Sequence, residues 1–175
     1  MTQALALAEQ QMLEPVGLDI GVLEQTLHQI MARNVDHADL YFESAHAESW
    51  VLEDGIIKEG SHSIDQGVGV RAVSGEKSGF AYSDEILLPA LTSAAETARA
   101  IVKSNGSGRL AAWTRHTPVA LYGAADPLDS LPTEQKIALL HKVDELARKR
   151  DPRVQQVIAS LAASHTTVLV AAIDG

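Results

Sequence analysis

The sequence predicts an α+β (mixed α/β) fold, in which about three helices pack on a mainly antiparallel, curved sheet. Apolar residues recur at helical spacing in three separate segments, whereas apolar and polar residues alternate over much of 40–82, with turn residues in between. A further apolar, strand-like run lies near the end of the chain. Apolar residues make up 46% of the 175 residues and aromatic residues only 4%, so we expect a core of Ala, Val, Leu and Ile.

The first part of the chain predicts helices ahead of the sheet. A short helix is expected over about residues 3–13, and it ends before Pro15. A longer helix is expected to follow Asp19, which is a good N-cap residue. Its buried stripe would hold Ile20, Leu23, Leu27, Ile30 and Met31.

Two more helices are expected downstream. One covers about residues 88–104 with Pro89 in its first turn, and the other covers about residues 132–150 and ends in basic residues that suit the helix dipole. The apolar stripe of the former would hold Leu91, Ala95, Ala98, Ile101 and Val102. The stripe of the latter would hold Ile137, Leu140, Val143 and Ala147.

The strands are predicted from alternation and from turn residues. Apolar and polar side chains alternate over 40–43 and 50–53, and Asp54-Gly55 is a strong hairpin signal. The glycine-rich segment 65–84 is predicted to be a second hairpin with a turn at 74–77. One face of its first strand would hold Val68, Val70 and Ala72, and one face of its second strand would hold Phe80 and Tyr82.

The same glycine-rich segment does not fit a phosphate-binding loop. Such loops need Gly-x-Gly-x-x-Gly between a strand and a helix, or Gly-Lys-Ser/Thr ahead of a helix. Here Gly67-x-Gly69 is followed by Arg71 and no helix pattern. The glycines therefore indicate bulges or close approach of another backbone.

We divide the chain into an N-terminal segment with a short helix (1–17), an α/β domain (18–163) and the start of a further strand or domain (164–175). Residues 105–130 show no period and are predicted to form a long loop anchored by Trp113 and Tyr122. The runs "RVQQVIASLAA" and "TTVLVAAIDG" are predicted to be two strands joined near Ser164-His165. Because an apolar strand ending in Asp-Gly would be an exposed edge, we expect the chain to be the front part of a longer polypeptide.

The composition argues against several classes of function. With a net charge of −9 and scattered Lys and Arg, we expect no direct binding of nucleic acid and no binding to anionic membranes. The chain has no cysteine, which excludes disulfides, thiolate metal sites and cysteine nucleophiles within it. Neither a signal peptide nor a membrane-spanning run is present in the sequence, so a cytoplasmic location is expected.

No catalytic or metal site can be assembled from the spacing of residues in 1–175. The seven histidines form no His-Glu-x-x-His pair, and no Gly-x-Ser-x-Gly elbow occurs. A weakly bound ion could be held by three neighbouring pairs, although hydrogen-bonded or exposed histidines are the more common outcome. These pairs are His46 with Glu48, His62 with Asp65, and His37 with Asp39.

The remaining charged residues of the strands are expected to be structural. The solvated face of the first hairpin would hold Glu48, Glu53, Asp54 and Glu59. Arg71 is expected to pair with Glu76, Glu59 or Asp65, or to bind a carboxylate of a partner chain. What remains is a sheet with unfinished edges, which indicates a role in interaction.

Several stretches of the sequence resemble a known family. They are "DLYF", "ESWVLEDGIIK", "DQGVGVRA" and "SGEKSGFAY", then "DPL" ahead of a helix with "KVD", and finally "RVQQVIASL" and "LVAAIDG". Together they resemble the N-terminal region of the TldD side of the TldD/PmbA family. The resemblance covers most of 18–175 and is densest over 37–84.

The resemblance implies a zinc-dependent peptidase of the bacterial cytosol, assembled with a homologous PmbA (TldE) type subunit. Its clients would be unfolded peptides, including precursors of peptide antibiotics and a labile antitoxin. The family's metal site is a His-Glu-x-x-x-His helix plus a cysteine, and neither occurs here, so zinc is expected C-terminal to residue 175. The present residues would then be a non-catalytic domain that shapes the peptide-access chamber and joins subunits.

Two other interpretations stay open. One is a free-standing interaction or adaptor domain without enzymatic activity, and the other is the metal-free PmbA-type subunit itself. The older family label, modulator of DNA gyrase, would point to DNA contact, but the charge of −9 favours an indirect effect.

Overall fold

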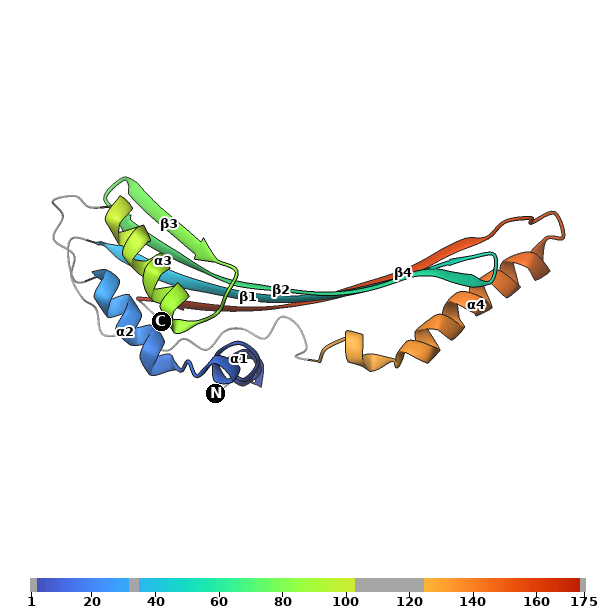
Figure 1. Ribbon diagram of the computed structural model, residues 1–175, viewed down its shortest axis with the longest axis horizontal. Coiled ribbons are helices and arrows are strands. Elements are labelled where there is room, and N and C mark those ends of the chain that lie inside the picture. The colour runs from blue at the N-terminus through green and yellow to red at the C-terminus, as the bar shows by residue number, and fades with distance from the viewer. Residues whose placement is uncertain (1–2, 32–34, 103–124, 174–175) are drawn as a thin grey trace. The chain divides into compact units, whose positions relative to one another are not determined.

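The computed structural model describes residues 3–31, 35–102 and 125–173 (Figure 1). Its helices are α1 (Gln3–Ala8), α2 (Ile20–Met31), α3 (Leu88–Ile101) and α4 (Thr133–Arg150). Its strands are β1 (His37–Glu53), β2 (Ile56–Ser74), β3 (Lys77–Ser83) and β4 (Ile158–Ala172). A π-helical turn (Glu9–Leu13) and 3-10 turns (Glu14–Val16 and Leu128–Ser130) complete the described elements.

The four strands form one sheet in the order β3-β2-β1-β4. β4 runs antiparallel to β1, because the Ile173 N–H donates to the Ala38 carbonyl at 3.1 Å and the Asp54 N–H donates to the Val157 carbonyl at 3.0 Å. β2 and β3 are also antiparallel. The predicted α+β class with a mainly antiparallel sheet is confirmed.

Both predicted hairpin turns are present. Asp54 and Gly55 have φ of 48° and 76°, the two positive values that a tight two-residue hairpin turn requires. At the second turn Ser74 pairs with Lys77, and Gly75 has φ of 56°. Asp54 is the one described non-glycine residue with positive φ, and Asp tolerates this region better than most residues.

The described residues fall into two compact units, which share β1, β2 and β4. Unit 1 comprises the described residues within 1–44, 65–102 and 167–173, and unit 2 comprises 45–64 and 125–166. In unit 1, α2 and α3 supply buried side chains, as do the strands, and Figure 1 shows both helices beside the sheet. The centre of this core includes Leu23, Leu27, Leu40, Phe42, Val68, Val70, Ala72, Leu91, Ala98 and Leu169.

Most of the predicted helix stripes are confirmed. The Val22 N–H donates to the Asp19 side chain at 2.9 Å, so Asp19 caps α2 as expected. Ile101 is 54% exposed, against prediction; it is the last residue of α3, and its Cβ lies close to Gly79. Val143 is also exposed against prediction, at 50%, whereas Leu140 of the same stripe is buried.

Two further expectations concern the second half of the chain. The predicted pair of strands joined near Ser164-His165 is wrong, since β4 runs without a break from Ile158 to Ala172. No glycine or proline interrupts this segment, so Ser164 and His165 simply alternate between the two faces of one long strand. The predicted loop anchors Trp113 and Tyr122 lie outside the described residues.

Candidate functional site

In unit 1 the sheet face opposite the core, which we call the open face, carries exposed aromatic side chains. Tyr41 on β1 is 39% exposed, and Phe80 and Tyr82 on β3 are 59% and 78% exposed. The rings of Phe80 and Tyr82 are stacked, with centroids 6.2 Å apart. The chain has only two tryptophans, three tyrosines and two phenylalanines, so this is a large share of its aromatic side chains on one surface.

Beside these rings the open face has a hollow of about 300 Å³, which we call the aromatic hollow. Its floor includes two glycines of β2. A Cβ at Gly69 would lie 3.1 Å from the Phe80 ring, and a Cβ at Gly67 would lie 2.7 Å from the Ser83 carbonyl oxygen. The lining comprises Tyr41, Glu43, residues 65–69, Phe80 and residues 82–84.

The rim of the aromatic hollow is acidic. Glu43, Asp65 and Asp84 belong to the lining, and no Lys or Arg does. The Tyr41 hydroxyl donates to Glu43 Oε2 at 2.5 Å, and this hydrogen bond, with smaller contributions from desolvation and the negative charge, raises the pKa of Tyr41. Among the described residues no basic group lies within 4 Å of the Asp65 or Asp84 carboxylate.

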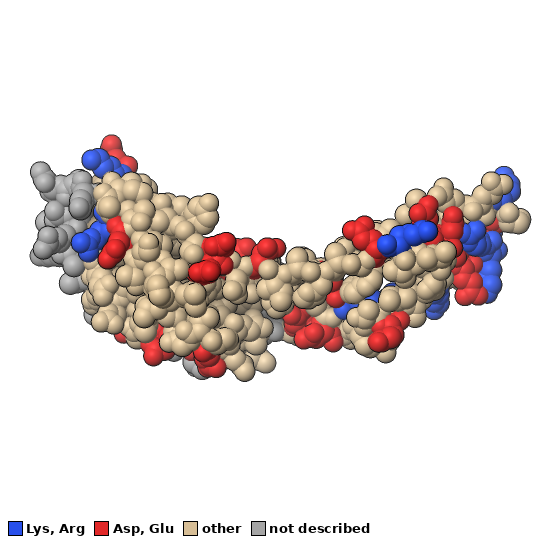
Figure 2. All heavy atoms as spheres, in the orientation of Figure 1, with Lys and Arg blue, Asp and Glu red and all other residues tan. Residues whose placement is uncertain are grey.

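The face of the molecule that Figure 2 draws has no large basic patch. There, Lys and Arg atoms form small groups next to Asp and Glu atoms, and no continuous basic stripe is visible. With a net charge of −9 the chain repels anions at long range. The aromatic hollow is therefore suited to a cation.

Within the described ranges, no helix is both long and apolar enough for a membrane span.

Unit 2 contains a buried ion pair that fixes α4 to β1. Lys136 Nζ lies 2.5 Å from Glu48 Oε1, and the two side chains are only 7% and 9% exposed. The same ammonium donates to the Leu128 carbonyl at 2.5 Å and lies 5.4 Å from the Trp50 ring centroid. With its donors used in this way, Lys136 anchors the helix and is not free for catalysis.

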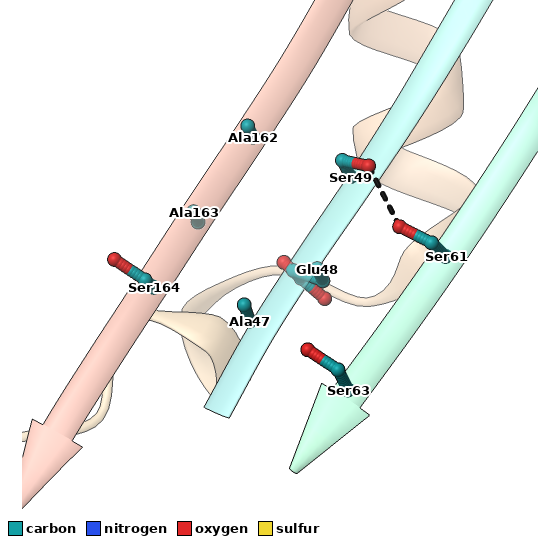
Figure 3. A pocket seen from close by; sticks show the side chains of 8 residues that line it. All are labelled: Ala47, Glu48, Ser49, Ser61, Ser63, Ala162, Ala163 and Ser164. Carbon is teal, nitrogen blue, oxygen red and sulfur yellow. Dashed lines mark hydrogen bonds between the residues drawn. The ribbon is translucent and has the colours of Figure 1, made fainter. Parts of the chain in front are cut away.

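Unit 2 also has an open, small-residue surface with a hollow of about 340 Å³ (Figure 3). Figure 3 shows the hydroxyl groups of Ser49 on β1 and Ser61 on β2 turned toward each other, and they share a hydrogen bond of 2.8 Å. No histidine belongs to this lining, and the Glu48 carboxylate is held by Lys136. The serines therefore have no general base beside them to activate a nucleophile.

Arg71 has a partner that the sequence did not predict. Its Nε and Nη2 atoms each lie 2.7 Å from Asp39 Oδ2, so the expected partners Glu76, Glu59 and Asp65 are wrong. Both residues lie on the open face of adjacent strands. Side chains on neighbouring strands lie closer together there than side chains several residues apart on one strand. The same Asp39 oxygen lies 3.4 Å from His37 Nε2.

The strand carboxylates are less uniform than expected. Glu48 was predicted on the solvated face, which is wrong, because it faces α4 and is buried with Lys136. Asp54 is exposed, as predicted, but it also binds Arg148 at 2.6 Å. The pairs His46 with Glu48 and His62 with Asp65 are not part of a larger metal-binding group. The described residues contain no cluster of three or more His, Asp or Glu side chains that could hold a metal ion.

Sequence reasoning missed the features that define both surfaces. It placed Phe80 and Tyr82 on one face of a strand but not on the open face, because large aromatics are usually buried. A usable signal was the small size of Gly79 and Ala81 on the alternate face, which matches the alanine-rich helix α3. No local pattern identified Lys136 as a buried residue.

Comparison with known proteins relates the chain to a family of metallopeptidases. Residues 38–102 match the model of PmbA/TldA metallopeptidase domain 1, and residues 126–175 match the PmbA/TldA metallopeptidase central domain. A metalloprotease TldD homolog of Haemophilus influenzae is 50% identical over 94% of this chain and 34% of that protein. Homologs of the same name from two Buchnera aphidicola subspecies are 42% identical over 85% of this chain and 31% of each. The chain thus spans about a third of the length of these curated relatives.

Solved structures share the fold at low sequence identity. A modulator of DNA gyrase from Bacteroides thetaiotaomicron has a TM-score of 0.61 at 17% identity, over 89% of this chain and 36% of that chain. The TldE of Thermococcus kodakarensis has a TM-score of 0.52 at 17% identity, over 85% and 34% of the two chains. These likenesses concern the fold, while the domain models and the 50% identity establish the lineage: the chain belongs to the TldD/PmbA metallopeptidase family.

Proposed function

We propose that these residues form the non-catalytic N-terminal domain of a TldD-like zinc metallopeptidase, where they shape the access of unfolded peptides and join subunits. The observation that carries the proposal is the 50% identity to the Haemophilus influenzae metalloprotease TldD homolog over 94% of this chain. The curated relatives named above carry the TldD name, which favours this interpretation over the metal-free PmbA-type subunit.

The zinc ion that the family implies does not fit the described residues. Residues 3–31, 35–102 and 125–173 contain no group of three or more His, Asp or Glu side chains that could hold a metal ion, and the chain has no cysteine. The nearest arrangement, His37 with Asp39, is occupied by the Arg71 guanidinium. We therefore assign metal binding to residues C-terminal to 175 and no catalytic step to this chain.

Binding roles are what these residues can supply. β3 and β4 are the two outer strands of the sheet, and an extended peptide can add to such an edge through its main chain, whatever its sequence. This suits an enzyme whose clients are unfolded peptides. The fold shared with the Thermococcus kodakarensis TldE supports a homologous PmbA/TldE-type subunit as the partner. We place this assembly in the cytoplasm, and the net charge of −9 disfavours direct binding of DNA.

Metal analysis of two proteins tests the assignment of the catalytic site. The 175-residue chain and the full-length Haemophilus influenzae relative are purified, and their zinc content and cleavage of an unstructured peptide are measured. We expect zinc and cleavage in the full-length protein and neither in the 175-residue chain. Stoichiometric zinc together with cleavage by the 175-residue chain would contradict the proposal.

A deletion tests the binding role. The hairpin that corresponds to residues 47–60 is removed from the full-length relative, and association with its PmbA-type subunit and peptide cleavage are both measured. We expect both to fall, with zinc content unchanged. If association and cleavage equal those of the wild type, the assigned role is wrong.

A further inference from the structure

The rings of the aromatic hollow are placed to accept a ligand. Phe80 and Tyr82 are 59% and 78% exposed, although large aromatic side chains are normally covered by the protein that carries them. Their stacking holds the two rings together as one surface. Exposed aromatic groups of this kind are characteristic of binding surfaces, where they contribute much of the binding energy.

The negative charge of the rim favours a positively charged ligand. Glu43, Asp65 and Asp84 contribute three carboxylates to the lining, and no basic side chain belongs to it. Arg71 is the nearest cation along β2, and it is already paired with Asp39. A cation over an aromatic face and beside carboxylates is favoured by both groups at once.

The shape of the hollow selects the size of the ligand. At about 300 Å³ it is at the lower end of ligand pockets, which fits one long side chain and not a large cofactor. The absence of a Cβ on Gly69 gives room to the Phe80 ring, and its absence on Gly67 gives room to the Ser83 carbonyl oxygen, so these glycines let β3 and its ring lie close to β2. A guanidinium is planar, stacks on rings and has five N–H donors for carboxylates, whereas an ammonium is compact and strongly hydrated.

We propose that the aromatic hollow binds the arginine side chain of an extended, unfolded peptide. The hollow lies against β3, an outer strand of the sheet, so the main chain of such a peptide can follow the strand edge while its arginine enters the hollow. This inference deepens the proposed function, on which it rests for the role of the peptide as a client, and it names arginine-bearing peptides as a preferred class.

A titration followed by NMR tests the site directly. The probes are acetyl-Gly-Ser-Arg-Ser-Gly-amide and the same peptide with citrulline, which has nearly the same shape and no charge. We expect the arginine peptide to shift the amide signals of Gly67, Gly69 and Tyr82 and to bind roughly five- to tenfold more tightly than the citrulline peptide. Its affinity should fall as salt rises from about 50 to about 300 mM, because the rim is exposed.

Variants assign the binding to named groups. Tyr82→Ala and the double variant Asp65→Asn with Asp84→Asn should each weaken binding of the arginine peptide about three- to tenfold. Both sites are exposed, so the fold is expected to survive, and the spectrum of each variant verifies this. Glu76→Gln is the matched control, because Glu76 is an exposed carboxylate in the turn at the other end of the β2–β3 hairpin and should leave binding unchanged.

Three outcomes would overturn the proposal. One is equal affinity for the arginine and citrulline peptides, and another is a set of shifted amides that lies away from the hollow. The third is concentration-dependent self-association through the open face without peptide, which would make a second copy of the chain the occupant. Because the titration needs neither metal nor cleavage, its failure would reject the arginine site and leave the peptidase proposal to its own test.

Discussion

A buried lysine is the most consequential single residue in unit 2. Lys136 gives up the hydration of its ammonium and regains three interactions, with Glu48, the Leu128 carbonyl and the Trp50 ring. Such a pair contributes little net stability against an apolar alternative, but it is costly to break on one side only. The position and rotation of α4 therefore depend on keeping both partners.

Substitution of Lys136 measures this dependence. Lys136→Met should lower the free energy of local unfolding of α4 by about 3–5 kcal/mol, because Glu48 is left as a buried charge without its partner. Native-state hydrogen exchange of the α4 amides provides the measurement. Adding Glu48→Leu to the same chain should restore most of the loss.

The control is an exposed ion pair on the same helix. Lys149 and Glu145 are 69% and 60% exposed, so Lys149→Met should change the same free energy by no more than about 1 kcal/mol. Equal effects of Lys136→Met and Lys149→Met would show that burial does not decide the strength of these pairs.

Gly79 is the residue through which α3 approaches the sheet. A Cβ at this position would lie 2.2 Å from the Ala98 carbonyl oxygen and 3.0 Å from the Ile101 Cβ. Gly79→Ala should therefore destabilise unit 1 by about 1–3 kcal/mol or more, since backbone atoms must shift. Urea denaturation measures the change, and Ser78→Ala on the opposite face of β3 should be close to neutral. A neutral Gly79→Ala would mean that α3 can move away at no cost.

At the scale of elements, the β1–β2 turn is held to the segment that follows α4. The Val157 N–H lies 3.0 Å from Asp54 Oδ1, and this bond is the main cause that lowers the pKa of Asp54. The Arg148 guanidinium, at 2.6 Å from the same oxygen, lowers this pKa further. The hairpin turn thus serves as an acceptor for two neighbouring segments as well as reversing the chain.

This arrangement predicts that the stability contributed by the Asp54 contact depends on pH in the acidic range. Because the pKa of Asp54 is lower in the folded chain than its usual value of 3.8, the contact contributes stability above pH 3.8 and loses it as pH falls through the folded value. The amide signal of Val157 should therefore titrate with a midpoint below 3.8, and Asp54→Asn should abolish that titration. A midpoint at or above this value would contradict the contact.

At the scale of the whole molecule, the two units have unequal cores. Among the described residues, the continuous apolar core lies in unit 1. Unit 2 buries Leu52, Leu128, Leu140 and Val157 together with the Glu48–Lys136 pair. Local opening costs less where fewer apolar groups are covered.

Hydrogen exchange along β1 should reveal this difference within one strand. Amides of residues 38–43, in unit 1, are expected to exchange at least about tenfold more slowly than amides of residues 46–53, in unit 2. The comparison is internal, because both sets belong to the same strand in the same sample. Uniform protection along β1 would show that the sheet opens as one body.

Much of the fold followed from local patterns. The Asp19 cap of α2, the apolar stripes of α2 and α3, both tight turns and the buried set Val68, Val70 and Ala72 depend on spacing and on residues with special backbone preferences, which the sequence displays directly. The continuity of β4 was missed because polar residues at Ser164 and His165 look like a turn when no partner strand is considered.

The sequence alone determined the class of fold, the hairpins, the family resemblance and the absence of cysteine chemistry. Only the tertiary structure decided that Glu48 and Lys136 are buried together, that Arg71 pairs with Asp39, and that Phe80 and Tyr82 lie on the open face. The physical reason is that spacing within one strand or helix fixes which side chains share a face. Which face is covered depends on segments far away in the chain, and so does the partner that each charge meets.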